Sequence, residues 1–340
     1  MTPDLSLRLE GIAGAALRRS EATATAYARP SGLFRLDTAP LRIGIIRNAK
    51  ARLNIARRGI DIGLAANCAM PRSHDELHDA LAMFARTGVN ALVIDGGDGT
   101  VRDVLTAAAF HYRGIFPTVA VLPSGKTNAL ATDLGLPQGW TEQAAVDALR
   151  AGRTQERGPL EIWRPGMAIA EHRGFIFGAG AFVRATALAQ DTHRLGAFNG
   201  LAVGLSVAGA VAQTLFGRSD NVWRRGTPMR IAPAGAPATE GAKYLFFGST
   251  LTRLPLDLRP FGEPRSGLKT LCIDAPPAGL ALALPAVLAG YDLPAGGGYR
   301  RDDSESMALT VGSDIILDGE TFPGGEMTLR HGAPIRFAVP

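Results

Sequence analysis

The sequence predicts an α/β protein in which a doubly wound parallel sheet is followed by a C-terminal antiparallel β-sandwich. Three observations lead to this fold class. The 340 residues suffice for about two domains of roughly 150 residues each. Up to about residue 157, apolar strand patterns alternate with helical patterns, as in parallel sheets. Beyond that point short apolar runs alternate with Gly, Pro and Arg turns, which is typical of sandwiches.

The first half divides into elements by its hydrophobic period. Short apolar runs predict strands at 41–46, 61–66, 91–94 and 118–122. Ser73 and Glu76 form a capping box that begins a helix, in which Leu77, Leu81 and Phe84 recur at helical spacing. Two further helices are predicted at 101–110 and 127–134. This alternation favours parallel strands with helical crossovers.

The second half contains short strands and two helix candidates. The strands are predicted at 167–170, 175–177, 229–231, 244–247, 268–273, 307–311 and 315–317, and the helices at 195–216 and 280–288. The first helix is uncharged and long enough to span a bilayer. Its Ala, Gly and Ser content favours a buried helix, with shallow membrane contact as the alternative.

We expect three segments along the chain. Residues 1–38 form an N-terminal extension, 39–157 the parallel-sheet domain and 158–327 the sandwich. A C-terminal strand within 328–340 can return to complete the first domain.

The charge narrows the class of binding partner, and the cysteines indicate the redox compartment. The net charge is +5, and only four of the 36 basic residues are lysines. The basic residues are scattered and form no basic, aromatic-interleaved stretch, so no nucleic-acid partner is expected, whereas phosphates or an acidic membrane suit the charge. Cys68 and Cys272 lie far apart and make neither a disulfide framework nor a zinc cluster, which fits a reducing cytoplasm.

The turn Gly96-Gly97-Asp98-Gly99-Thr100 lies where a strand meets a helix. Glycines let the backbone approach a phosphate, and the free N–H groups of a helix start attract its charge. Asp98 would repel a phosphate unless a divalent cation bridges them, which indicates Mg²⁺ and a nucleoside triphosphate. The alternative is an ordinary glycine turn with Asp98 or Thr100 as the helix N-cap.

The segment Pro123-Ser124-Gly125-Lys126-Thr127-Asn128 repeats this arrangement one strand later. It contains Gly-Lys-Thr, but Ala120 stands where a Walker A loop requires glycine. Two such turns at the carboxyl ends of parallel strands can line one nucleotide crevice. Lys126 then contacts a phosphate; the alternative is a solvated lysine at a helix start.

The segment Asp318-Gly319-Glu320 follows a predicted strand. A carboxylate beside a transferred phosphoryl group can accept the proton of an attacking hydroxyl, so one of this pair is a candidate general base. The alternative is an ordinary hairpin turn. His74 and His78 share one helix face, but without a third ligand we interpret them as surface residues.

From about residue 41 to the C-terminus, the order of these motifs resembles the diacylglycerol kinase catalytic family, in its bacterial lipid kinase and sphingosine kinase branch. The resemblance rests on Asn48, the turn 96–100, Asp103, the Pro-x-Gly-x-x-Asn turn of Pro123, Gly125 and Asn128, and residues 318–320. It implies ATP with Mg²⁺, a nucleotide domain followed by a lipid-binding sandwich, and a lipid hydroxyl as acceptor. It also implies a cytoplasmic protein in peripheral contact with an anionic membrane, and leaves homodimer formation open.

The resemblance also implies residue roles. Asp318 is the proton acceptor with Glu320 beside it, and Asp98 acts in the magnesium network. The nucleotide site comprises Asn48, Gly96, Gly97, Asp98, Gly99, Thr100, Asp103, Gly125, Lys126 and Asn128.

The sequence departs from the family pattern at several of these positions. Lys126 replaces the usual Thr or Ser, Asp103 the common Glu, and Ala49 a proline. Residues 266–270 lack the acidic side chains that some bacterial members use as a second metal site. Two alternatives therefore stay open: an enzyme similar to NAD kinase, which shares the GGDGT turn, and a catalytically weak regulator that binds nucleotide or lipid.

Overall fold

The computed structural model describes residues 40–48, 67–194, 225–277, 279–292 and 298–340. The expected extension 1–38, strand 61–66 and apolar helix 195–216 lie outside the described residues. Among the described helices, none combines the length and the apolar character needed to cross a membrane.

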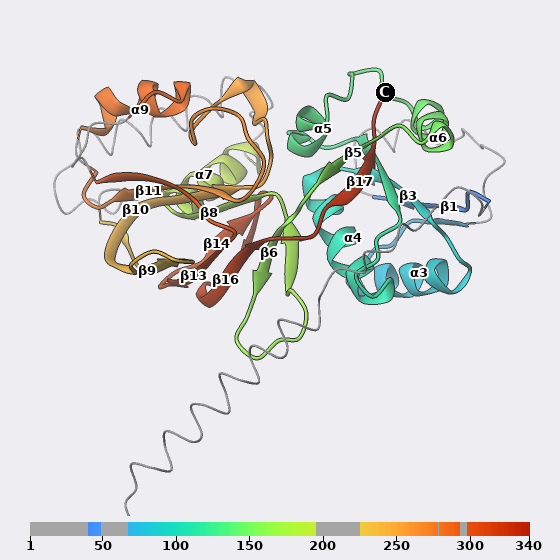
Figure 1. Ribbon diagram of the computed structural model, residues 1–340, viewed down its shortest axis with the longest axis horizontal. Coiled ribbons are helices and arrows are strands. Elements are labelled where there is room, and N and C mark those ends of the chain that lie inside the picture. The colour runs from blue at the N-terminus through green and yellow to red at the C-terminus, as the bar shows by residue number, and fades with distance from the viewer. Residues whose placement is uncertain (1–39, 49–66, 195–224, 278, 293–297) are drawn as a thin grey trace, which may run out of the picture. The chain divides into compact units, whose positions relative to one another are not determined.

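Sheet A is the parallel sheet that the first half of the sequence predicts (Figure 1). Within the described residues its order is β2-β1-β3-β4-β17-β5. All pairings are parallel except that between β17 and β5. The strands are β1 (Ile43–Arg47), β2 (Cys68–Ala69), β3 (Ala91–Gly96), β4 (Thr118–Pro123), β5 (Thr154–Arg157) and β17 (Ile335–Ala338).

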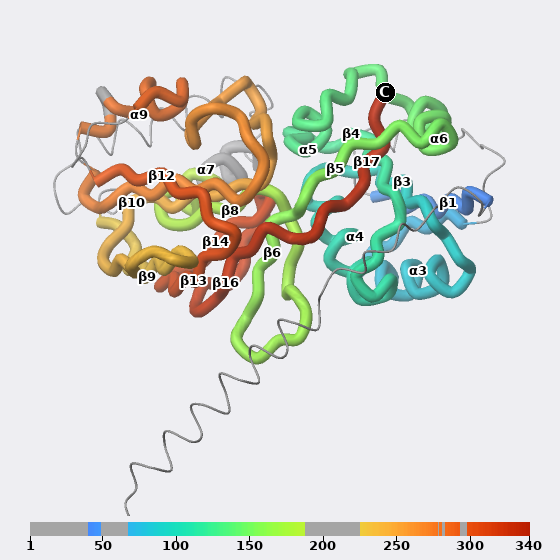
Figure 2. Tube along the Cα trace, viewed as in Figure 1, coloured from blue at the N-terminus to red at the C-terminus, as the bar shows by residue number. Residues whose placement is uncertain are grey.

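The C-terminal strand returns to sheet A, as Figure 2 shows where β17 lies beside β5. The preceding strand, β16 (Gly325–His331), pairs instead within the second sheet. The expected boundary at 157/158 falls between two strands of different sheets, and that at 327/328 falls inside β16. The domain division itself stays a prediction.

Some of the helices of the first half begin at a residue whose side chain caps them. Helix α3 (His74–Arg86) has Ser73 as its N-cap, whose side chain accepts from the Glu76 N–H, and the Glu76 carboxylate accepts from the Arg72 N–H at 2.7 Å. The Ser73 half of the predicted capping box is present, whereas the Glu76 carboxylate binds the N–H that precedes the N-cap residue. The other helices here are α4 (Asp98–His111), α5 (Ala129–Asp133) and α6 (Glu142–Ala151).

Helix α5 is shorter than the helix predicted over 127–134. Its N-cap, Asn128, has left-handed backbone angles, φ 50° and ψ 50°. Asparagine tolerates this conformation better than most residues, but a helix cannot continue through it. The Asn128 turn therefore delays the helix start to Ala129.

Sheet B is antiparallel at every pairing within the described residues. Its strands are β6 (Leu160–Trp163), β7 (His172–Gly174), β8 (Ile176–Gly180), β9 (Thr227–Pro233), β10 (Thr239–Ser249), β11 (Lys269–Asp274), β12 (Tyr299–Asp303), β13 (Ser306–Val311), β14 (Ile315–Leu317), β15 (Glu320–Phe322) and β16. Its helices are α7 (Ala181–Arg194), the 3₁₀ turn η2 (Pro255–Asp257) and α9 (Leu280–Ala289).

Strand β10 makes sheet B a sandwich, because it belongs to two layers. Its first half, 239–243, pairs with β9, and its second half, 245–249, pairs with β8 and β11. A register shift between Lys243 and Leu245 separates the halves, as β-bulges do where a strand changes direction. The predicted antiparallel sandwich is confirmed.

One predicted strand is wrong. Residues 167–170 lie in the loop between β6 and β7, with Met167 and Ile169 exposed. The loop is held by Arg164, whose guanidinium donates to the Glu171 carboxylate at 2.7 Å and to the Gly324 carbonyl at 2.5 Å. The apolar alternation of this segment thus fails to produce a strand because its backbone has no partner strand.

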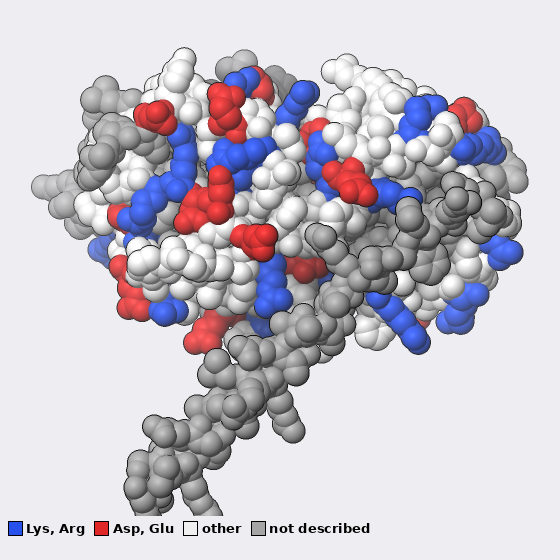
Figure 3. Space-filling view, in the orientation of Figure 1, with Lys and Arg blue, Asp and Glu red and all other residues white. Residues whose placement is uncertain are grey.

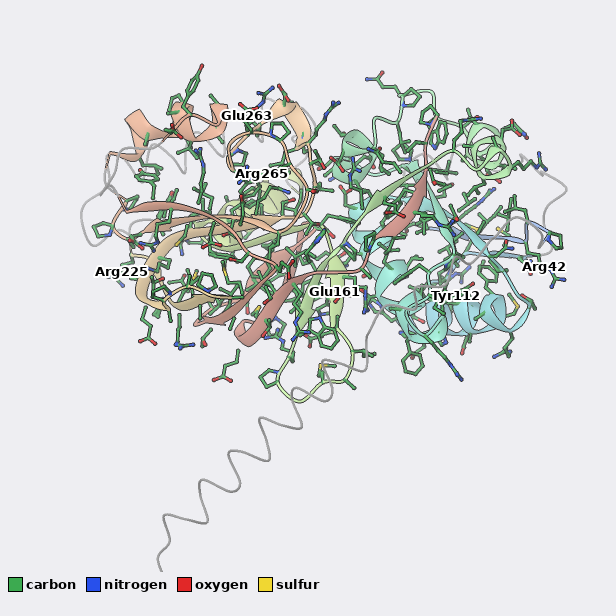
Figure 4. All side chains as sticks on the ribbon, in the orientation of Figure 1. Arg42, Tyr112, Glu161, Arg225, Glu263 and Arg265 are labelled. Atoms are coloured by element: carbon green, nitrogen blue, oxygen red, sulfur yellow. The ribbon has the colours of Figure 1, made fainter. Side chains whose placement is uncertain are left out.

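Lys269 begins β11 and is only 2% exposed. Its Nζ donates to the carbonyls of Arg265 and Gly267, at 2.9 and 2.8 Å. Figure 4 shows Glu263 and Arg265 on the loop that leads to this strand. Burial, with a smaller effect of the Arg265 charge, lowers the pKa of Lys269 to about 8. Segment 266–270 therefore holds a buried ammonium group.

We expect this lysine to make stability depend on pH. The unfolded chain keeps the lysine protonated up to about pH 10.5, so between its folded and unfolded pKa the unfolded state binds more protons. The free energy of unfolding should therefore rise by about 2 kcal/mol from about pH 7 to about pH 10, relative to the Lys269→Met variant. Urea titrations of both proteins measure it. A difference that stays constant with pH would contradict the low pKa.

Candidate active site

The GGDGT turn joins β3 to α4. Gly97 is the N-cap of α4 and supplies no side-chain hydrogen bond to the first helical turn. The preceding Gly96 packs against Thr100, since a Cβ on Gly96 would lie 2.5 Å from the Thr100 Cβ. The Asn48 side-chain amide donates to the Thr100 hydroxyl at 2.8 Å. The turn is thus held from β1 while the helix N-terminus has no side-chain cap.

The second glycine turn lies against the first. A Cβ on Gly125 would lie 2.5 Å from the Gly97 Cα, and a Cβ on Gly97 would lie 2.9 Å from the Gly125 Cα. The Asn128 side chain closes the turn by accepting from the Gly125 N–H at 2.9 Å and donating to its carbonyl at 3.0 Å. Ser124, buried at the strand end, donates to Asp95. Only glycine allows these two turns to touch.

Asp98 has a structural partner that the sequence does not predict. Its carboxylate accepts the Ala129 and Leu130 N–H groups at the start of α5, at 3.0 and 3.2 Å. Asp98 therefore joins the first turn to the helix that follows the second. Burial raises its pKa, although these backbone hydrogen bonds oppose the shift.

The Asp318-Gly319 turn connects β14 to β15. Both residues have positive φ, 47° and 83°, as the tight type I′ hairpin turn requires. The Asp318 carboxylate accepts from the Phe175 N–H at 3.1 Å and the Ile176 N–H at 2.9 Å. It also packs on Gly174, where a Cβ would lie 2.4 Å from its Oδ2. The carboxylate is therefore fixed by β8 and by the lack of a side chain at Gly174.

The pKa of Asp318 is displaced toward neutrality. Burial raises it to about 7, and the nearby Asp98 charge acts in the same direction. The Ile176 and Phe175 N–H groups and the Arg102 charge oppose this shift. A carboxylate with a pKa near the working pH is suited to accept a proton from a hydroxyl.

Glu320 is held by a buried arginine. The Arg102 guanidinium, 1% exposed, donates to the Glu320 carboxylate at 2.6 Å and to Asp103 at 2.8 Å. It also donates to the Leu317 carbonyl at 3.0 Å and lies over the Phe322 ring. Burial alone would lower the Arg102 pKa, but Asp103 and Glu320 outweigh it and raise the pKa.

These contacts bring the predicted motifs together. A Cβ on Gly99 would lie 3.4 Å from the Glu320 Oε1, so the DGE hairpin lies beside the first turn of α4. Lys126 is exposed on the second turn. The described residues hold no group of three or more His, Cys, Asp or Glu side chains with metal-site geometry. His78 contacts His111, at 3.0 Å between ring nitrogens, in agreement with a surface position.

Four residues of the site were not predicted from the sequence: Arg102, Ser124, Asp95 and Gly174. Arg102 left a signal, because it lies one helical turn after Asp98, so the helix places both side chains on one face beside the GGDGT turn. No sequence pattern distinguishes Gly174 from other strand glycines. A glycine is required at position 174 only because the Asp318 hairpin packs against β7 there.

Chemically, the site combines an anion-binding helix start with a poised carboxylate. The uncapped N–H groups and the dipole of α4 favour an anion beside Gly97. The glycine turns leave room for phosphate oxygens to approach the backbone, which a Cβ would exclude. Asp318 can take a proton close to that position.

Known proteins share parts of this arrangement. A model of the diacylglycerol kinase catalytic domain matches residues 62–160, which include both glycine turns but not the DGE hairpin. Over 53 residues the chain is 40% identical to the probable lipid kinase YegS of Salmonella newport (strain SL254) and to that of Salmonella arizonae (strain ATCC BAA-731 / CDC346-86 / RSK2980). This match spans 16% of the chain and 18% of the length of these curated relatives.

Solved structures extend the likeness to the whole fold. The crystal structure of a diacylglycerol kinase from Bacillus anthracis str. Sterne has a TM-score of 0.58 at 15% identity, and the match covers 88% of this chain and 97% of that one. Two other structures from the same bacterium have TM-scores of 0.63 and 0.61 at 16% identity. The solved structures thus share the fold of this chain, and the diacylglycerol kinase catalytic domain model matches the part of it, residues 62–160, that contains both glycine turns.

Proposed function

We propose that this chain is an ATP-dependent lipid kinase, which transfers the γ-phosphoryl group of ATP to a lipid hydroxyl. The observation that carries the proposal is the placement of Asp318 beside the GGDGT helix through the Arg102 contacts. A proton acceptor and an anion-binding helix start are the two protein groups that this reaction needs most. The kinase relatives support the same reaction class.

The two glycine turns bind the ATP phosphates in this proposal. The first-turn N–H groups of α4 donate to phosphate oxygens. Because Gly97 and Gly125 carry no side chain, the two turns lie against each other and no Cβ covers their backbone. Lys126, exposed on the second turn, adds positive charge. Asn48, Thr100 and Asn128 hold the turns in shape.

Asp98 is the residue that fits Mg²⁺. Mg²⁺ is usually bound by one or two carboxylates together with substrate phosphates and water, so a site with few protein ligands is sufficient. Each Asp98 oxygen accepts one backbone N–H and keeps further lone pairs. When bound, the ion would neutralise negative charge on the phosphates.

Asp318 removes the proton of the acceptor. The lipid oxygen forms a bond to the γ-phosphorus, the bond from that phosphorus to the β-phosphate oxygen breaks, ADP leaves, and the hydroxyl proton goes to Asp318. The backbone N–H groups of Phe175, just before β8, and of Ile176, at its start, orient this carboxylate. Asp103 and Glu320 act through Arg102.

A lipid acceptor requires contact with a membrane surface. We propose that this contact is peripheral, at anionic lipid, on the basis of the net charge of +5. On the face in Figure 3, described basic and acidic side chains alternate rather than forming a field of one sign. Such mixed charge limits the attraction to an anionic membrane, so the proposed contact is weak and falls with salt.

The Asp318→Asn variant tests the proton acceptor. Asparagine keeps the shape but cannot accept the proton, so kcat for phosphorylation of a lipid panel should fall by about 100-fold or more while ATP binding changes by less than about twofold. Labelled ATP with diacylglycerol, sphingoid base and isoprenoid alcohol measures turnover, and calorimetry measures binding. The control is Asp314→Asn, at an exposed position just before β14.

Three results would contradict the proposal. Undiminished turnover by Asp318→Asn would exclude this residue as the base. Phosphorylation of NAD rather than any lipid would favour the NAD kinase-like alternative. ATP binding by the wild-type chain without turnover on any acceptor would favour the regulator.

The Gly125→Ala variant tests the phosphate site. The added methyl group would collide with the Gly97 Cα and the Asn128 Oδ1, and such overpacking costs about 1–3 kcal/mol. We expect ATP affinity to fall about tenfold or more, because the turns must separate. Gly139→Ala is the matched control, since a Cβ there meets no atom within 4 Å. Equal ATP affinity in the two variants would refute this phosphate site.

A further inference from the structure

Arg102 contacts both ends of the turn that carries Asp318. Its Nη1 donates to the Leu317 carbonyl at 3.0 Å, just before the turn. Its Nη2 donates to the Glu320 carboxylate at 2.6 Å, just after the turn. The two residues between these contacts are Asp318 and Gly319. One guanidinium therefore brackets the turn.

The same side chain is anchored on the nucleotide side of the site. Arg102 lies in α4, one helical turn after Asp98, and its Nε donates to Asp103 at 3.1 Å. All three guanidinium nitrogens thus have an acceptor. A planar fork of fixed geometry can serve several acceptors at once, which a lysine ammonium on a flexible stem does less precisely.

Burial of Arg102 makes its contacts with the β14–β15 hairpin rigid. At 1% exposure the guanidinium is shielded from water, so it depends on its protein acceptors for hydrogen bonds. The Phe322 ring lies 5.0 Å from its central carbon and covers one face. The Glu320 side chain is 61% exposed, so the contact is buried on the arginine side and accessible on the glutamate side.

We propose that Arg102 is a positioning residue for phosphoryl transfer. It fixes the distance between the Asp318 carboxylate, on the β14–β15 hairpin, and the phosphate-binding start of α4. This inference rests on the proposed function for its kinetic consequence, but the positioning of the hairpin is independent of it. Hairpin mobility and turnover therefore test the two separately.

Hydrogen exchange tests the positioning without any substrate. In Arg102→Gln, the amides of residues 315–322 should exchange at least about tenfold faster than in the wild type, because the turn loses the hydrogen bonds from Arg102 at both of its ends. The rest of sheet B should keep its protection. The control is Asp274→Asn, which breaks an ion pair with the buried Lys243 elsewhere in sheet B and should leave the hairpin unchanged. Unchanged exchange in Arg102→Gln would overturn the proposal.

Arg102→Lys keeps the positive charge beside Asp103 and Glu320. It replaces Arg102→Gln in the exchange experiment if the glutamine variant fails to fold. A lysine cannot bracket both ends of the turn at the same time. We expect its hairpin amides to exchange faster than in the wild type as well. Wild-type exchange and wild-type kcat in Arg102→Lys would show that charge alone suffices, which would overturn the proposal.

Kinetics in two backgrounds separate positioning from general damage. A misplacement of about 1 Å can cost about 100-fold in rate, so Arg102→Gln should lower kcat by about that factor with a KM for ATP within about twofold of the wild type. In the Asp318→Asn background the same substitution should lower the residual kcat by less than about twofold, because no base is left to position. Equal losses in both backgrounds would refute the role.

Lipid kinase activity and the positioning role of Arg102 can fail separately, and the measurements distinguish the two cases. If the wild-type chain phosphorylates no lipid, the proposed function fails while hydrogen exchange still decides whether Arg102 holds the hairpin. If the wild type is active and the hairpin stays protected in both Arg102 variants, the positioning role alone fails.

Discussion

The buried guanidinium of Arg102 is the contact on which the candidate site depends. It joins α4, whose N-terminus carries the GGDGT turn, to the hairpin that carries Asp318. Helix α4 follows a strand of sheet A, whereas the hairpin belongs to sheet B. The Thr106 hydroxyl of α4 adds a second link by accepting from the Arg173 N–H of β7 at 2.9 Å. A buried charge with several fixed acceptors tolerates little displacement, so it defines a single arrangement of the two motifs.

Backbone N–H groups stabilise two neighbouring carboxylates by the same means. Asp98 accepts from the start of α5, and Asp318 accepts from Phe175 and Ile176. Burial raises the pKa of both carboxylates. The charge of Asp98 further raises the pKa of Asp318. A divalent cation or a proton would relieve this repulsion. The two carboxylates therefore favour a cation beside the position where phosphates are proposed to bind.

The sequence predicts local motifs far better than their contacts. The alternation of elements, the Ser73 N-cap and the two glycine turns all follow from short-range patterns, and the structure confirms them. The proximity of the DGE hairpin to GGDGT depends on Arg102 and Glu320, which are 218 residues apart. No local pattern encodes that pairing. Segment 167–170 has strand-like alternation but no neighbour to pair with, so periodicity alone misleads there.

The return of β17 to sheet A has a consequence for the order of assembly. Strand β17 pairs with β4 on one side and β5 on the other, and among the described strands β5 joins sheet A only through it. During synthesis, β4 therefore presents an open edge until residues 335–338 emerge, after the whole of sheet B. An unpaired parallel edge is a site for wrong association. The half of the molecule that contains sheet A thus matures last, although the other strands of that sheet are made first.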